Sequence, residues 1–146
     1  MPTHQETGQV NRPAKRCTTH RTFTCGLSTL NTVTVQIGGS VTIPCFYDNR
    51  YKTDVKYWCN GSDWSSCTAI VRTDSPQISD EVLIRDDPVK QIFNVTMINL
   101  TTGDTGYYWC GVEITRGSSV GTRVFLSVTL GKMSVLQTVA NEMLSM

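Results

Sequence analysis

The stretch Asp104–Cys110 constrains the fold more than any other part of the sequence, because it reads D-T-G-Y-Y-W-C. Its Tyr108 stands two residues before a Cys, which is the spacing of a tyrosine corner, where the hydroxyl bonds back to the backbone upstream. A two-sheet β-sandwich of this kind also needs an earlier Cys followed by a Trp, and Cys45 and Trp58 occur in that order. Trp58, Asp104 and Tyr108 therefore form the core signature of an all-β sandwich.

The rest of the chain supports a variable-type immunoglobulin sandwich of two antiparallel sheets with Greek-key connections. Alternating apolar and polar residues, separated by Gly, Pro and Asp turns, predict a series of short strands. The predicted strands are residues 31–37, 40–47, 55–59, 66–72, 81–86, 91–98, 105–114 and 122–130. The domain is expected to span residues 31–130, between a disordered leader at 1–30 and a tail at 131–146.

Strand parity assigns the cysteine pairs. Cys45 and Cys110 both take inward positions on different sheets, so they are predicted to join the sheets. Trp58 is inward, which turns Cys59 outward, and Cys59 cannot reach Cys45 unless the register slips by one residue. Cys67 on the adjacent strand is the nearest partner for Cys59; the alternative is that both remain free thiols.

The composition indicates an extracellular domain. Six Cys in a small strand-rich chain are typical of an oxidising compartment. N-glycosylation acceptors begin at Asn60, Asn94 and Asn99. Residues 1–21 hold no apolar run, and no apolar stretch reaches about 18 residues. We therefore expect a cell-surface or secreted domain, with neither a signal peptide nor a transmembrane helix in this chain.

The residues of the predicted domain do not assemble a catalytic or metal site. Both His residues, His4 and His20, lie in the leader, so no Ser–His pair is available, and no Gly-rich phosphate loop occurs. Cys17, His20 and Cys25 lack the paired spacing and fourth ligand of a zinc site. A net charge of +1 without a basic stripe argues against nucleic acid. We expect neither an enzyme nor a metal or cofactor.

Several motifs together resemble one family. K-Y-W-C at 56–59, I-R-D-D at 84–87, F-N-V-T-M-I-N-L at 93–100 and the motif at 104–111 look like the variable-type domains of the polymeric immunoglobulin receptor and the CMRF-like leukocyte receptors, in the version of bony fishes. The resemblance covers about residues 31–130, and it too implies a Cys59–Cys67 pair. One departure is Glu81, where family members usually have an Arg that pairs with the Asp at position 104.

The resemblance implies the ectodomain of an immune receptor that binds ligand through loops 48–54, 73–80 and 115–121. Arg50, Tyr51 and Lys52 in the first loop, with Arg116 in the last, would form a basic rim. CMRF-like receptors recognise membrane lipids, and the first loop of the polymeric immunoglobulin receptor contacts immunoglobulin. Either a lipid headgroup or an immunoglobulin is therefore a candidate ligand, while the rim cations could equally be solvated.

An adhesion or packing module, or a soluble decoy, is the alternative function. Tyr57, Tyr107 and Trp109 are predicted to point outward on one sheet and could meet another immunoglobulin-domain receptor. Loss of binding in Arg50→Ala would favour the loops as the binding site. Loss of binding in Trp109→Ala, with the loops intact, would favour the sheet face.

Overall fold

The computed structural model describes residues 4–10, 26–75, 77, 79–114 and 118–131. Ten strands and three short 3₁₀ helices occur in these residues. The strands are β1 His4–Val10, β2 Leu27–Ser28, β3 Leu30–Gln36, β4 Val41–Tyr47, β5 Val55–Asn60, β6 Thr68–Arg72, β7 Val82–Asp87, β8 Ile92–Met97, β9 Gly106–Ile114 and β10 Ser118–Thr129. The helices are η1 Asn49–Tyr51, η2 Trp64–Ser66 and η3 Thr102–Asp104.

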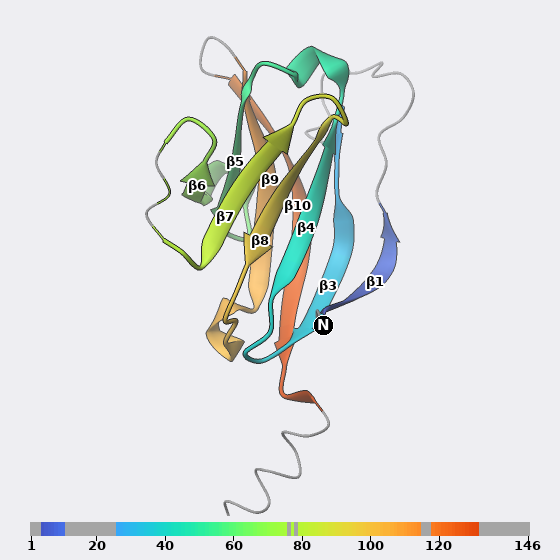
Figure 1. Cartoon of the computed structure of the whole chain (residues 1–146), viewed down its shortest axis with the longest axis vertical. Helices are drawn as coiled ribbons and strands as arrows, with labels where there is room; N and C mark the ends of the chain where they lie inside the picture. The colour runs from blue at the N-terminus through green and yellow to red at the C-terminus, as the bar shows by residue number, and fades with distance from the viewer. Residues whose placement is uncertain (1–3, 11–25, 76, 78, 115–117, 132–146) are drawn as a thin grey trace, which may run out of the picture.

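The strands form two sheets packed face to face (Figure 1). One sheet has six strands in the order β1-β3-β10-β9-β5-β6, and the other has four in the order β2-β4-β8-β7. The chain changes sheets after each of β1 to β4 and again after β6 and β8, which gives the predicted Greek-key connections. One pairing differs from the prediction of wholly antiparallel sheets: β3 runs parallel to β10.

The core lies between the sheets and is built around the residues of the signature. Trp58 is fully buried, and its indole stacks on the Tyr108 ring with centroids 5.2 Å apart and planes within 8°. Cys45 and Cys110 are bonded across the sheets, with Cα atoms 6.1 Å apart, as strand parity predicts. Inward positions of β3, β4, β8 and β10 complete the core with Val, Ile, Phe and Leu side chains. Burial of this apolar surface is the main stabilising term of the fold.

The N-terminal boundary of the domain differs from the prediction of a disordered leader over residues 1–30. Leu27 and Leu30 are buried, and β2 pairs with the end of β4. The backbone of β1 pairs with β3 and extends the six-stranded sheet at its edge. A two-residue strand and a Thr-rich segment show little alternation of apolar and polar residues. The sequence therefore predicts a disordered leader here. Predictions for Cys17, Cys25 and residues 132–146 lie outside the described residues.

The chain changes sheets at Thr29. Ser28 pairs with Phe46 in the four-stranded sheet, whereas Leu30 opens β3 in the six-stranded sheet. The buried Thr29 hydroxyl donates a hydrogen bond of 2.7 Å to the carbonyl of Pro44. Proline cannot donate to a ladder, so it is tolerated in β4 because the neighbouring strand has left this point.

The tyrosine corner is present and explains how Asp104 is satisfied without an arginine. The Tyr108 hydroxyl donates to the Asp104 carbonyl at 2.7 Å. The Asp104 carboxylate accepts from the backbone N–H of Thr101 at 2.8 Å and from its hydroxyl at 3.2 Å, in a capping box at η3. Glu81 is exposed. A local turn contact therefore replaces the ion pair that the family resemblance implies.

Tyr108 is expected to make the domain sensitive to alkali. Burial, with the nearby Asp104 charge, raises the pKa of Tyr108 to about 12, whereas the unfolded value is about 10. Between these values the unfolded chain binds fewer protons than the folded one, so stability falls as pH rises above about 10. Urea unfolding from about pH 9 to about pH 12 should show this decline, and Tyr108→Phe should make it shallower. An unchanged decline in Tyr108→Phe would contradict this assignment.

Candidate functional site

The first candidate surface is the loop of residues 48–54 between β4 and β5, which we call the tip. Its helix η1 begins after Asp48, whose Oδ1 accepts from the backbone N–H of Arg50 at 3.2 Å. Arg50 and Lys52 are exposed, and the Arg50 guanidinium lies 5.2 Å from the Tyr51 ring centroid. Tyr51 is only 5% exposed. The prediction that Tyr51 contacts ligand is therefore corrected, because its buried ring anchors η1 to the core.

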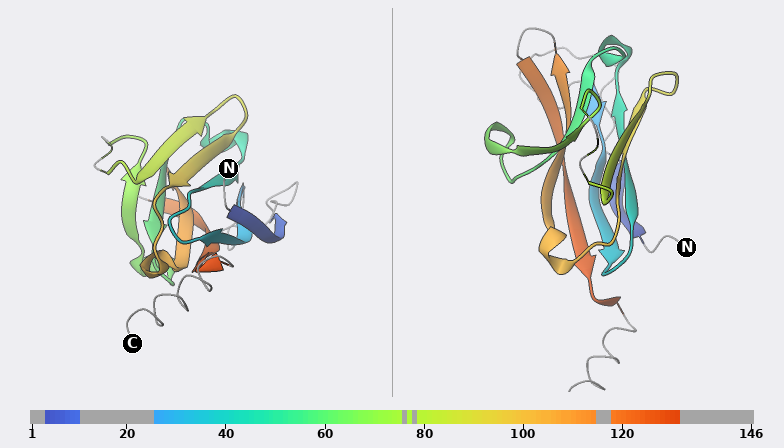
Figure 2. Two further views of the ribbon diagram at one scale, coloured as in Figure 1. Left: turned by 60° about the horizontal axis from the view of Figure 1, so that its bottom comes forward. Right: turned by 60° about the vertical axis from the view of Figure 1, so that its left-hand side comes forward.

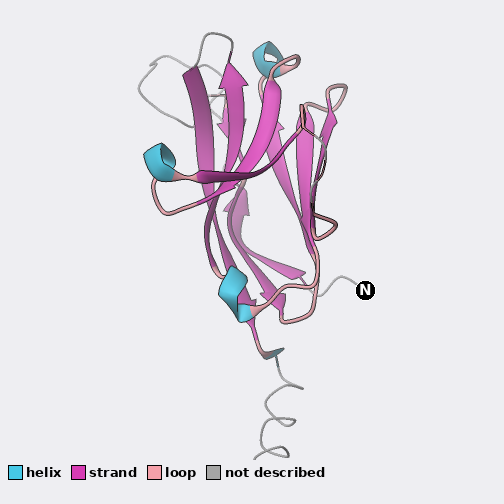
Figure 3. Cartoon of the chain, turned by 90° about the vertical axis from the view of Figure 1, so that its left-hand side faces the viewer, coloured by secondary structure: helices cyan, strands magenta, loops and turns pink. Residues whose placement is uncertain are grey.

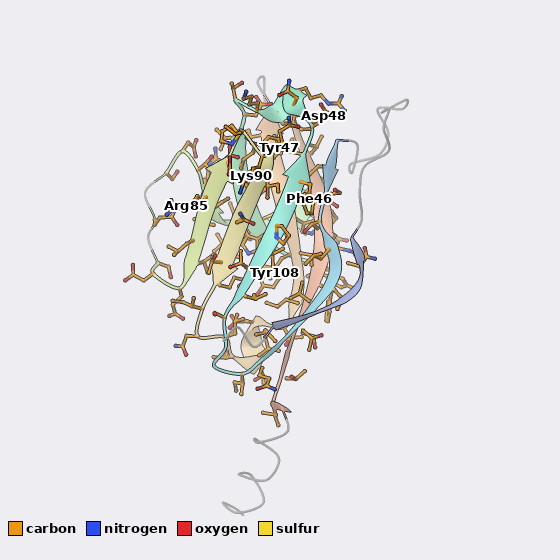
Figure 4. All side chains as sticks on the ribbon, turned by 45° about the vertical axis from the view of Figure 1, so that its right-hand side comes forward. Phe46, Tyr47, Asp48, Arg85, Lys90 and Tyr108 are labelled. Carbon is orange, nitrogen blue, oxygen red and sulfur yellow. A yellow bond between two sulfur atoms is a disulfide. The ribbon has the colours of Figure 1, made fainter. Side chains whose placement is uncertain are left out.

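A buried charge network lies directly beneath the tip. Lys56 is completely buried, and its Nζ donates to the carbonyl of Asp54 at 2.7 Å and to Asp86 Oδ2 at 2.9 Å. The other Asp86 oxygen accepts from the Tyr47 hydroxyl at 2.7 Å, and Nζ lies 4.3 Å from the Tyr47 ring centroid. Burial, followed by the bond to Asp86, raises the pKa of Tyr47 well above its ordinary value. The network ties the end of the tip to β7 (Figure 4 labels Tyr47 and Asp48).

The formal charges of the tip balance. Arg50 and Lys52 are matched by Asp48 and Asp54 within the same seven residues. Asp48 Oδ2 lies 3.9 Å from an Arg50 guanidinium nitrogen, at the outer limit of an ion pair. The tip is therefore a mixed-charge surface, and a weaker cationic rim than the sequence predicts. Arg116, the fourth predicted rim residue, lies outside the described residues.

The connection between β6 and β7 does not gather at the tip as predicted. It begins where the Thr73 N–H donates to the Lys56 carbonyl and ends where Glu81 accepts from the Ile98 N–H at the far end of β8. At its start Arg72 binds the carboxylates of Asp74 and Glu113 at 2.8 and 2.9 Å. The described parts of this connection therefore lie along the side of the sandwich (Figure 1).

The second candidate surface is the outer side of β5, β9 and β10, which carries five aromatic side chains and is called here the aromatic face. Its residues are Tyr57, Trp64, Tyr107, Trp109 and Phe125. Tyr57, Tyr107 and Trp109 lie on this face as predicted, but Tyr57 is half-buried because the hairpin between β5 and β6 folds Trp64 onto it. The ring centroids of that pair are 6.0 Å apart.

Trp64 is a functional candidate that the sequence did not reveal. A Cβ at Gly121 would overlap the Trp64 ring, and one at Gly111 would overlap Tyr57, so the two glycines make room for the rings. The Cys59–Cys67 disulfide, predicted by parity, closes the hairpin that carries Trp64. Cys59 itself is fully buried under this cover. Figure 2 shows the hairpin projecting from the six-stranded sheet on the side away from the four-stranded sheet.

The three predicted glycosylation acceptors lie in different settings. Asn60 is exposed at the end of β5, where its amide donates to the Tyr107 carbonyl at 3.1 Å. Asn94 is half-buried in the middle of the four-stranded sheet. Asn99 is exposed in a turn with φ of 54°. Exposure favours Asn60 and Asn99 over Asn94 as acceptors, and all three remain predictions.

The described residues contain neither a metal-binding cluster nor a membrane-spanning helix. Within this part of the chain no three or more His, Cys, Asp or Glu side chains form a group that could hold a metal ion. None of its helices has the length and apolar character needed to cross a bilayer.

Comparisons with known proteins agree with the geometry of the sandwich. The family model of the immunoglobulin V-set domain matches residues 29–129. CMRF35-like molecule 7 of Mus musculus is 41% identical over 98 residues, which are 64% of this chain and 46% of that protein. The chain thus spans about half the length of this relative.

Two solved structures are similar as well. The ectodomain of the teleost fish polymeric Ig receptor superposes with a TM-score of 0.62 at 44% identity, covering 68% of this chain and 48% of that chain. The first Ig domain of the mouse polymeric immunoglobulin receptor gives a TM-score of 0.61 at 28% identity, covering 71% and 94%. With its two-sheet fold, its disulfide between the sheets and these matches, the chain belongs to the immunoglobulin V-set family and is similar to the CMRF35-like molecules and the polymeric immunoglobulin receptor.

Proposed function

We propose that this chain is the ligand-binding domain of an immune receptor, displayed outside the cell, and that it binds a protein ligand at the tip. The observation that carries the proposal is the exposure of Arg50 and Lys52 on a loop that buried side chains anchor. These exposed cations lie on either side of buried Tyr51, and Lys56 holds the loop backbone from below. A loop already held in one conformation loses little entropy when a ligand binds.

The charge of the tip favours a protein over a lipid surface. Anionic membranes attract clusters of basic residues, whereas Asp48 and Asp54 offset the two cations of the tip. A mixed-charge surface suits a polar patch on a protein, where complementary charges set orientation. Similarity to the polymeric Ig receptor makes an immunoglobulin the first protein to test. A lipid headgroup is the competing ligand.

Arg50→Ala is expected to weaken binding to polymeric immunoglobulin about tenfold, the loss of one charge-assisted contact. The variant should fold normally, because the bond that caps η1 comes from the Arg50 backbone and not from its side chain. Binding of the oxidised full chain to immobilised polymeric immunoglobulin would be measured at low and at high salt. Screening should weaken the native chain more than the variant.

Arg85→Ala is the matched control, because Arg85 is an exposed cation on β7 in the other sheet (Figure 4). This variant should bind as the native chain does. Vesicles of phosphatidylserine and phosphatidylcholine form the second arm. Binding to vesicles without binding to immunoglobulin would contradict the proposal, and so would loss on Trp109→Ala with full binding by Arg50→Ala.

A further inference from the structure

The aromatic face contains a recess that the proposed tip site does not use. It lies beneath the hairpin between β5 and β6, whose helix η2 is visible at the side of the six-stranded sheet (Figure 3). Its volume is about 350 Å³. Its lining combines two indoles, one guanidinium, one carboxylate and two hydroxyls, from Ser62, Asp63, Trp64, Ser65, Trp109 and Arg123. We call it the indole recess.

Arg123 is the cation of the indole recess, and within the described residues it contacts aromatic rings but no carboxylate. Its guanidinium carbon lies 4.2 Å from the Tyr107 ring centroid and 5.9 Å from that of Trp109, which is the residue directly opposite on β9. The ion pairs found among the described residues do not include Arg123, although Asp63 lines the same recess. The rings of Tyr107 and Trp109 thus orient the Arg123 guanidinium, whose paired N–H donors match the two oxygens of a carboxylate.

The two indoles of the recess are fixed before any ligand arrives. The Trp109 N–H donates to the Gly61 carbonyl at 2.8 Å, which sets the orientation of its ring. Trp64 stacks on Tyr57 and lies within the hairpin closed by the Cys59–Cys67 disulfide. The planes of the two indoles are tilted by 49°, with centroids 5.4 Å apart. They form a preorganised aromatic corner, which reduces the free-energy cost of binding.

We propose that the indole recess binds an acidic sugar, a pyranose that carries a carboxylate. The C–H face of such a ring is apolar and flat enough to pack on an indole, as aromatic side chains pack apolar surfaces. Its carboxylate would pair with Arg123 in a bidentate, charge-assisted hydrogen bond. The Ser62 and Ser65 hydroxyls and the Asp63 carboxylate offer acceptors and donors for the sugar hydroxyls.

The size of the recess favours a sugar over other acidic ligands. About 350 Å³ lies at the small end of ligand pockets, which run from about 300 to 1,000 Å³. One or two sugar rings match this volume, whereas an extended acidic peptide needs a groove or a sheet edge. The recess lies on the face of the sheet, where β9 is paired on both sides. The proposal is independent of the tip, so either can fail without the other.

The test is a titration of the oxidised full chain with N-acetylneuraminic acid and glucuronic acid, with neutral galactose as the third arm. The chain is produced without N-glycans, so that no sugar on Asn60 lies near the recess and its side chain remains an uncharged amide. Chemical shifts of the tryptophan indole N–H groups report binding. We expect the acidic sugars to bind at least tenfold more tightly than galactose, at concentrations up to about 10 mM.

Three variants locate the site. Arg123→Ala should weaken binding of the acidic sugars at least tenfold and leave the weak response to galactose unchanged, since the exposed guanidinium supplies only the contact to the carboxylate. Trp64→Ala should weaken the binding of acidic and neutral sugars alike, because it removes the indole on which the sugar ring packs. Arg85→Ala, an exposed cation on the other sheet, should bind like the native chain.

Several results would overturn the proposal. One is equal binding of acidic and neutral sugars; another is tight binding of an acidic sugar that survives Arg123→Ala. Absence of any response to the sugars, with an Arg123-dependent response to a glutamate-rich peptide, would assign the recess to an acidic protein segment instead. The peptide belongs in the same titration series, so that this outcome is visible.

Discussion

Replacing Lys56 with alanine is expected to destabilise the domain by about 3 kcal/mol, the lower end of the usual effect of breaking a buried ion pair, because the Asp86 side chain is 20% exposed. The change leaves the Asp86 carboxylate and the Asp54 carbonyl without the Nζ that lies 2.9 and 2.7 Å from them. A buried acceptor that loses its donor keeps the full desolvation penalty. Urea unfolding of the oxidised chain, compared with that of the native protein, measures the difference.

The matched control is the double variant Lys56→Met/Asp86→Leu, which removes both charges and keeps apolar volume. We expect it to recover most of the lost stability, because hydrophobic replacement of a whole buried pair is often neutral. A loss below about 1 kcal/mol in Lys56→Ala would show that water at the partly exposed Asp86 carboxylate replaces the Lys56 contact and that the network is not a structural requirement.

The double variant Cys45→Ala/Cys110→Ala is expected to lose about 4 kcal/mol of stability. This disulfide joins positions 65 residues apart, and the chain-entropy model relates such a loop to that value. Both cysteines are fully buried in the core, where Cys110 pairs with Trp58 and Cys45 with Phe93, so small cavities add to the loss. The midpoint of urea unfolding is the measurement.

Cys59→Ala/Cys67→Ala is the comparison variant, because that disulfide spans a separation of only 8 residues. The same model gives it about 2.5 kcal/mol. The short disulfide should matter more for the indole recess than for stability, since it closes the hairpin that carries Trp64. Equal stability losses in the two double variants would contradict the loop-length argument.

Much of the fold follows from parity in the sequence. Val, Ile and Cys at alternate positions of β4 predict the inward side of that strand, and the structure buries Val41, Ile43 and Cys45. The same rule applied to β5 buries Trp58. It also predicts that Lys56, two residues earlier, points inward, yet a lysine is normally read as a solvent-facing residue. Its burial depends on Asp86 and Tyr47 from distant strands, which no local pattern contains.

The candidate surfaces were less predictable than the core. Tyr51 lies in a polar loop, and only its size and apolar ring hinted that it would anchor the loop. Trp64 stands in a short connection of small polar residues, so nothing nearby in the sequence indicated that it covers Tyr57. Its position depends on the small surfaces of Gly111 and Gly121, which come from two other strands. The positions of Tyr51 and Trp64 both depend on contacts between strands and loops that are distant in the sequence.

The parallel pairing of β3 with β10 determines how the domain responds to mechanical load. Thr32 to Gln36 lie beside Phe125 to Thr129 in one continuous register. A force applied between the start of β3 and the end of β10 acts along both strands, so their hydrogen bonds are sheared together and not opened one at a time. Rupture under force is governed by the unfolding rate. Tension between Leu30 and Thr129 is therefore expected to meet more resistance than tension that peels one strand from the edge of its neighbour.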